Sequence, residues 1–80
     1  MEKICSLDRL GVGDSAEVIK LENAGSIRRR LLDMGITEGS TISCVLRAPL
    51  SEPCAYLVKG AVIAIRKNDS KKIIVRCNDV

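Results

Sequence analysis

The sequence predicts a mainly β protein: a small β-barrel of about five short strands with one short α-helix after the first strand. Three observations predict it. Short runs rich in Val, Ile and Leu alternate with turns of Gly, Pro and Asn. Only one longer segment has helical periodicity. A chain of 80 residues fits a single domain, residues 1–80, and closing its short strands into a barrel is the economical architecture.

The first predicted strand is Ser15–Glu22, which is rich in β-branched and alternating positions. Ser6–Leu10 before it could form one helical turn. Gly11–Asp14 then reads as a tight reversal, because glycine and aspartate tolerate the backbone angles that turns need.

The predicted helix runs from Ser26 to Met34, where Ile27, Leu31 and Met34 recur at helical spacing and share one face. Ser26 suits the N-cap position, and Gly35 suits the C′ position after the last turn. A helix of about nine residues is too short to stand alone in water. We therefore expect this apolar stripe to dock on the strands.

The later strands are predicted at 40–47, 54–59, 61–67 and 73–77. Ser40–Arg47 alternates clearly, with Ile42, Cys44 and Leu46 expected on the core face. Pro49 and Pro53 bound a loop, because proline cannot donate to a sheet. Gly60 between two strand-like runs indicates a turn or a bulge, and the polar stretch 68–72 leaves room for a single helical turn.

The charges on the helix oppose its macrodipole. Arg28 and Arg29 lie in the first turn and Asp33 in the last, where each is disfavoured by about 0.3–1 kcal/mol. An exposed Arg29–Asp33 pair contributes only about 0.3–0.5 kcal/mol, which does not cover the deficit. The arginines therefore serve a partner or a tertiary contact, or form a solvated face that tolerates a small cost.

The composition argues against catalysis. The chain has no His, the usual general base and commonest metal ligand, and its carboxylates are scattered. Tyr56 is the only aromatic residue, so neither base stacking nor an aromatic groove for proline-rich peptides is expected. We expect no enzyme, no cofactor and no nucleic-acid partner, with duplex binding through Arg28, Arg29 and Arg30 as the open alternative.

The four cysteines are expected to be free thiols, because no secretory signal is recognisable and the cytosol keeps thiols reduced. Cys44 and Cys54 flank one hairpin, while Cys5 and Cys77 could meet if the terminal strands pair. A shared metal site or two disulfides are the alternatives, although the spacing lacks the paired knuckles of zinc sites. No apolar run approaches the roughly 20 residues of a membrane span, so we expect a soluble, cytoplasmic protein without direct membrane insertion.

A series of motifs resembles the FeoA family of bacterial ferrous iron uptake. It comprises Arg28-Arg29-Arg30-Leu31-Leu32-Asp33-Met34-Gly35-Ile36, Glu38-Gly39, Ala48-Pro49-Leu50, Pro53, Gly60 and Ile65-Arg66-Lys67. The resemblance covers about residues 7–75. It implies an SH3-like barrel and an accessory protein that acts on the cytosolic GTPase region of the membrane ferrous iron permease, FeoB. In the family this loop usually reads Pro-Leu-Gly-Asp-Pro, and here Ser51 and Glu52 stand in place of the Gly and the Asp. Ser70 stands where the family commonly has Ala.

We predict a partner-binding surface on the helix and the proline-bounded loop, where an apolar tip beside fixed cations suits a binding hot spot. Its residues are Arg28, Arg29, Asp33, Pro49, Leu50 and Glu52. The alternative is that Leu50 packs inward and the arginines brace the loop. Self-association stays open.

A second function class is also open, because the same barrel occurs as the regulatory C-terminal domain of metal-dependent transcriptional repressors. Those repressors carry a helix-turn-helix region upstream. On that alternative, this chain would be a fragment.

Overall fold

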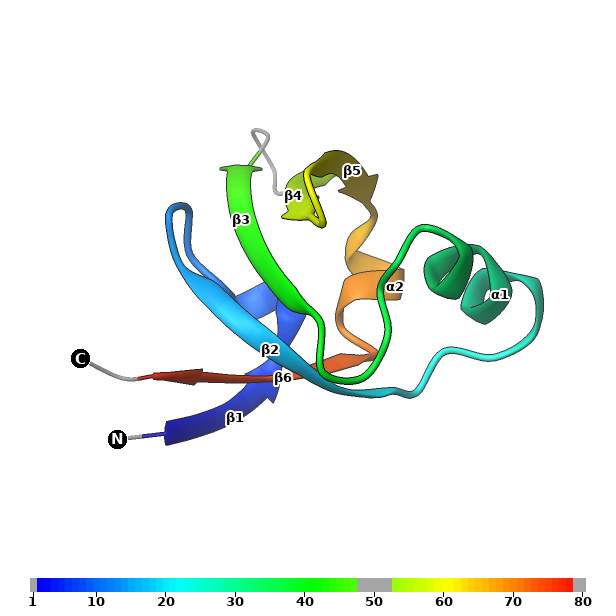
Figure 1. Ribbon diagram of the computed structural model, residues 1–80, viewed down its shortest axis with the longest axis horizontal. Helices are drawn as coiled ribbons and strands as arrows, with labels where there is room; N and C mark the ends of the chain where they lie inside the picture. The colour runs from blue at the N-terminus through cyan, green and yellow to red at the C-terminus, as the bar shows by residue number, and fades with distance from the viewer. Residues whose placement is uncertain (1, 48–52, 79–80) are drawn as a thin grey trace.

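The computed structural model describes residues 2–47 and 53–78, and it contains one six-stranded antiparallel sheet in the order β1-β6-β2-β3-β4-β5. Figure 1 shows the sheet strongly bent, with α1 at one side of the molecule and α2 beneath β5. The elements are β1 (Glu2–Ser6), η1 (Leu7–Arg9), β2 (Ser15–Leu21), α1 (Gly25–Asp33), β3 (Thr41–Arg47), β4 (Cys54–Val58), β5 (Ala61–Ile65), α2 (Lys67–Ser70) and β6 (Ile73–Asn78).

The predicted mainly β fold is confirmed, with one strand more than the sequence suggested. The additional strand is β1, which pairs with β6 from Glu2↔Asn78 to Ser6↔Ile74. Because β1 precedes β2, the helix follows the second strand of the sheet. The helical turns expected before β2 and before the last strand are present as η1 and α2.

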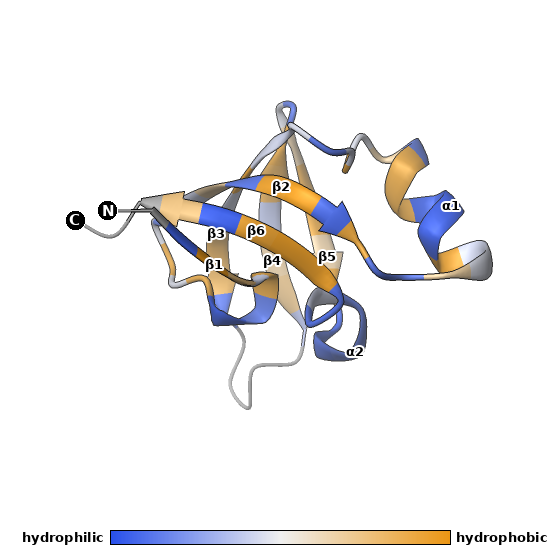
Figure 2. Cartoon of the chain, turned by 90° about the horizontal axis from the view of Figure 1, so that it is seen from below, coloured by the Kyte–Doolittle hydropathy of each residue, from blue (hydrophilic) through white to orange (hydrophobic). Residues whose placement is uncertain are grey.

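The core is almost entirely aliphatic, as the composition predicted, and only Tyr56 adds an aromatic ring. Figure 2 shows the apolar residues concentrated along the strands. The buried cluster consists of Leu7, Leu10, Ala16, Val18, Leu21, Leu31, Ile36, Ile42, Cys44, Cys54, Tyr56, Val58, Ile63, Ile65, Ile73 and Val75.

One predicted core position in β3 is wrong. Ile42 and Cys44 are buried as expected, but Leu46 is 60% exposed. The β3–β4 register shifts between Cys44 and Leu46, because a bulge places one extra residue in β3. Beyond a bulge the side-chain alternation is displaced, so Leu46 no longer follows Cys44 into the core.

The segment around Gly60 is a tight turn. Val58 pairs with Ala61 across the β4–β5 hairpin, which leaves Lys59 and Gly60 as the two loop residues. Both have positive φ, 50° and 83°, as a type I′ hairpin turn requires. Of the two alternatives at Gly60, the turn is correct.

The helix α1 ends as predicted and begins differently. Ala24 occupies the N-cap and makes no side-chain capping bond, so the prediction of Ser26 is wrong. At the other end Gly35 has φ 92°, its N–H donates to the Leu32 carbonyl, and the Ile36 N–H donates to the Leu31 carbonyl. This is the Schellman arrangement, which satisfies the last carbonyls of the helix and turns the buried Ile36 into the core.

Candidate functional site

A groove of about 330 Å³ separates α1 from the opposite wall, formed by the end of β5 and by α2. Figures 1 and 2 both show α1 standing away from the sheet on this side. Three residues of α1 and its C-cap residue line one side of the groove, and four residues line the opposite wall: Ile27, Arg30, Leu31 and Met34, facing Ala64, Ile65, Arg66 and Asp69.

The apolar stripe of α1 is only partly covered by the rest of the protein. Leu31 is 4% exposed, whereas Ile27 and Met34 are half-buried and pack at the margin of the core. On the opposite wall Ile65 is buried and Ala64 is exposed. The predicted docking of the stripe is therefore confirmed for Leu31, while its two outer members leave apolar surface accessible in the groove.

The polar rim of the groove carries more positive than negative charge. Arg30 and Arg66 contribute two cations and Asp69 one carboxylate, which gives a local charge of +1. None of the three forms an ion pair with another residue in the ranges 2–47 and 53–78. The half-buried side chains of Ile27 and Met34 beside unpaired guanidinium groups are suited to bind an apolar segment that carries a carboxylate.

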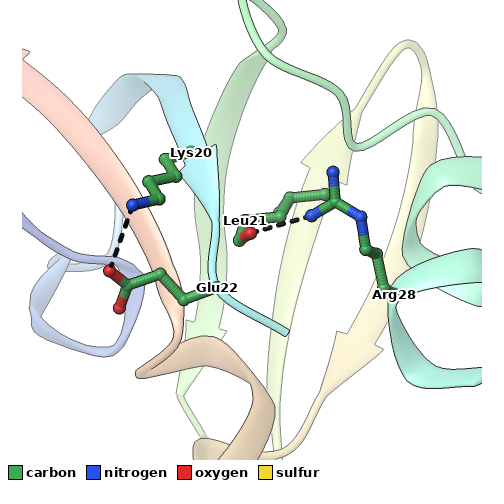
Figure 3. Close-up of polar contacts among 4 residues, drawn as sticks. All are labelled: Lys20, Leu21, Glu22 and Arg28. Carbon is green, nitrogen blue, oxygen red and sulfur yellow. Dashed lines mark hydrogen bonds and ion pairs between the residues drawn. The ribbon is translucent and has the colours of Figure 1, made fainter. Parts of the chain in front are cut away.

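Hydrogen bonds near the beginning of α1 fix it relative to the sheet. Arg28 Nη1 donates to the Leu21 carbonyl at the end of β2, with a separation of 2.8 Å, as Figure 3 shows. Asn23 Nδ2 donates to the Asp69 carbonyl at 3.0 Å, which ties the segment before α1 to α2. The two walls of the groove are thus held together at this end.

A second set of bonds holds the segment after the helix. Ser40 Oγ donates to the Gly35 carbonyl at 3.0 Å, and the Thr37 N–H donates to Ser40 Oγ at 3.1 Å. Ser40 is 8% exposed, so this polar side chain is buried with its hydrogen bonds made. The connection from α1 to β3 is therefore a defined structure.

The predicted site residues separate into three groups. Arg28 makes the tertiary contact just described, which explains one cation that opposes the helix dipole. Arg29 and Asp33 are exposed and do not pair with each other. Pro49, Leu50 and Glu52 lie outside the described residues, so the predicted neighbourhood of helix and loop stays a prediction.

The predicted apolar stripe includes three of the groove residues, but sequence reasoning missed Arg30 and the opposite wall. A signal existed for Arg30, which lies three residues after Ile27 and four before Met34 and so shares their side of the helix. Ala64, Arg66 and Asp69 had no such signal, because only the folded sheet brings β5 and α2 opposite α1. The helix side of the groove could therefore be predicted from the sequence, and the opposite wall could not.

Two ionisable groups of the core, Tyr56 and Cys44, favour their neutral forms. Burial raises the pKa of Tyr56, and burial together with the nearby Cys54 raises the pKa of Cys44. All four cysteines are free thiols, and Cys5 lies beside Cys77 as expected from paired terminal strands. No group of three or more His, Cys, Asp or Glu side chains is placed to hold a metal ion in the part of the chain that the structure describes.

Among the described residues, no helix combines the length and the apolar character needed to cross a membrane.

Comparison with known proteins gives concordant matches. A family model described as the FeoA domain matches residues 5–77. The Fe(2+) transport protein A/Fe(2+) transporter FeoB fusion protein of Porphyromonas gingivalis is 38% identical over 69 residues, which make up 86% of this chain. The match covers only 8% of that fusion protein.

Solved structures agree with the fold. Iron(II) transport protein A from Clostridium thermocellum superposes with a TM-score of 0.86 and 32% identity, covering 90% of this chain and 44% of that one. FeoA of Stenotrophomonas maltophilia, described as a procaryotic SH3 domain protein and solved with zinc, superposes with a TM-score of 0.78 and 27% identity. The match covers 88% of this chain and 87% of that one. A manganese-dependent transcriptional repressor superposes with a TM-score of 0.84 at 16% identity, covering 98% of this chain and 44% of that one. At this identity the likeness is one of fold alone.

Proposed function

This chain belongs to the FeoA family of ferrous iron transport, and on that premise we propose that it is a cytoplasmic accessory protein that docks on the GTPase region of a membrane ferrous iron permease. The groove beside α1 is the proposed docking surface. The proposed action is binding, without a catalytic step of its own.

The joining of the two partners in one relative supports the choice of partner. In the fusion protein of Porphyromonas gingivalis a related sequence and the transporter FeoB form a single chain. Fusion keeps two domains at high effective concentration, which suits domains that act on each other. The likeness to the repressor rests on fold alone and supports no corresponding proposal for this chain.

The groove is the single observation that supports the docking surface. Its volume of about 330 Å³ is enough for a few apolar side chains, and its rim suits a carboxylate. The proposed occupant is therefore an apolar segment of the permease flanked by acidic residues. A standard interface takes about 800 Å² from each partner, so the contact extends beyond the groove onto the exposed side chains of Arg29 and Asp33.

A matched pair of substitutions in β5 tests the groove. Ala64 and Val62 are both exposed and lie two residues apart on the same face of the strand, but only Ala64 lines the groove. We expect Ala64→Arg to abolish co-purification with the isolated GTPase region of the permease. Val62→Arg, which adds the same charge beside the groove, should leave co-purification intact.

The rim charge is tested separately with Arg30→Glu, which reverses one of its two cations. This substitution should weaken binding to the GTPase region, and the loss should shrink as salt screens the charges. If the wild type does not bind the GTPase region, the partner is wrong. If Ala64→Arg binds as well as Val62→Arg, the partner stands and the groove is not the docking surface.

A further inference from the structure

The thiols of Cys5 and Cys77 form a pair at the edge of the sheet. β1 is an edge strand and pairs only with β6, in a register that sets Cys5 opposite Val75 and Lys3 opposite Cys77. The two cysteines are therefore diagonal neighbours on one face of the sheet. Both are half-buried and pack against the core, and their Sγ atoms lie 3.9 Å apart.

This separation is suited to a bridging ion. A disulfide bond measures about 2.03–2.05 Å, so forming one here requires the sulfurs to approach by nearly 2 Å. A thiolate binds a first-row d¹⁰ ion such as Zn²⁺ at about 2.3 Å. Two sulfurs 3.9 Å apart can both contact one ion of this kind while the paired strands keep their register.

The number of donors selects the kind of ion. No third His, Cys, Asp or Glu joins the pair within the described ranges, and structural zinc is almost always held by four ligands. Soft thiolates also select Cu⁺, for which two such ligands can suffice. We propose that Cys5 and Cys77 form a two-coordinate site for a monovalent thiophilic ion, Cu⁺.

The surroundings of the pair favour such a complex. Two thiols that bind one Cu⁺ release two protons, and the bis-thiolate complex carries a charge of −1. Lys3 and Arg9 carry positive charges near Cys5, and they would offset this charge.

The site is distinct from the docking groove. In Figures 1 and 2, β1 lies on the other side of the molecule from α1. The ion would bridge the first and last strands of the domain, so its binding should raise the thermal stability of the folded chain. The proposal is independent of the proposed docking on the permease.

The test is an anaerobic titration of the reduced full chain with Cu⁺ buffered by bicinchoninate, whose coloured Cu⁺ complex fades as the protein takes copper from it. We expect one Cu⁺ per chain, two protons released per ion and a rise in the unfolding temperature. Removing a residue that only hydrogen-bonds to a metal ligand lowers metal affinity by about 10–100-fold. Cys5→Ser and Cys77→Ser each remove a ligand itself, so each should weaken Cu⁺ affinity at least that much. Cys54→Ala removes a thiol outside the pair and should leave affinity unchanged.

X-ray absorption of the copper-loaded wild type should show two sulfur ligands on each copper ion. This measurement does not need the serine variants, so it tests the site even if a variant fails to fold. The proposal is overturned if the wild type takes no Cu⁺ from the chelator, or if affinity survives in both serine variants. Three or more sulfur ligands per copper would also overturn it, because the ion would then be shared with other cysteines or another chain.

Discussion

Arg28 and Arg29 are adjacent in the chain, but their guanidinium groups have different roles. Arg28 reaches back to the Leu21 carbonyl at the end of β2 (Figure 3). Arg29 is exposed and contacts no other described residue through its charge. Arg28, the fourth residue of α1, lies against the helix dipole and is explained by this tertiary contact. Because α1 begins at Gly25, Arg29 is the middle residue of the helix, beyond the predicted first turn, and its charge is available to a partner.

This difference predicts unequal effects on stability. Arg28→Ala removes a charge-assisted hydrogen bond at an exposed position and should lower the free energy of unfolding by about 1 kcal/mol. Arg29→Ala, the matched control, should change it by less than about 0.5 kcal/mol. Urea denaturation of both variants measures this, and equal effects would contradict the assigned roles.

The thiols predict how stability depends on pH. Burial raises the pKa of both Cys44 and Cys5 above the ordinary thiol value of 9.0. As pH rises toward and past this value, the unfolded chain loses thiol protons that the folded chain still holds, so stability falls. Below it both states are protonated and the stability from these groups is fully present.

Urea midpoints measured between about pH 7 and 10 should therefore decrease toward the alkaline end. The Cys5→Ser variant removes one titrating group and should show a shallower decrease. A stability that stays level or rises with pH in the wild type would contradict this account.

At the scale of elements, the sequence predicted those that carry their own local signal. The alternation in β2 and β3, the apolar stripe of α1 and the glycines at its end and in the β4–β5 turn all correspond to observed structure. β1 was missed because Glu2–Ser6 has no clear alternation and becomes a strand by pairing with β6 at the other end of the chain. The burial of Leu46 was mispredicted because nothing local indicates the bulge.

The bulge in β3 predicts that two apolar residues on this strand differ sharply in importance. Leu46→Ser should change stability by less than about 0.5 kcal/mol, since the side chain is already exposed. Ile42→Ala should cost about 2–5 kcal/mol, because it opens a cavity in the core. If chemical denaturation showed comparable losses for both, the bulge would be misplaced.

The β4–β5 turn predicts a stabilising substitution. Lys59 has φ 50°, a left-handed conformation that asparagine adopts more readily than lysine. Lys59→Asn creates an Asn-Gly turn and should raise the free energy of unfolding by about 0.5–1 kcal/mol. A lower thermal midpoint for this variant would argue against the type I′ turn.

At the scale of the whole molecule, the groove exists only because segments distant in sequence are brought together. Ile27 and Arg30 come from α1, while Ala64 and Asp69 come from β5 and α2. The sequence indicated the helix as part of a binding surface, but its choice of companion, the loop with Pro49 and Leu50, rested on residue type alone. Which segment lies opposite the helix depends on the order of strands, which local patterns do not encode.

The most direct test of this account is ferrous iron uptake in cells that lack the native protein and produce the wild type, Ala64→Arg or Val62→Arg at equal levels. The account predicts that the wild type and Val62→Arg restore uptake and that Ala64→Arg does not. Full restoration of uptake by Ala64→Arg would contradict it, because the groove would then be dispensable for ferrous iron transport.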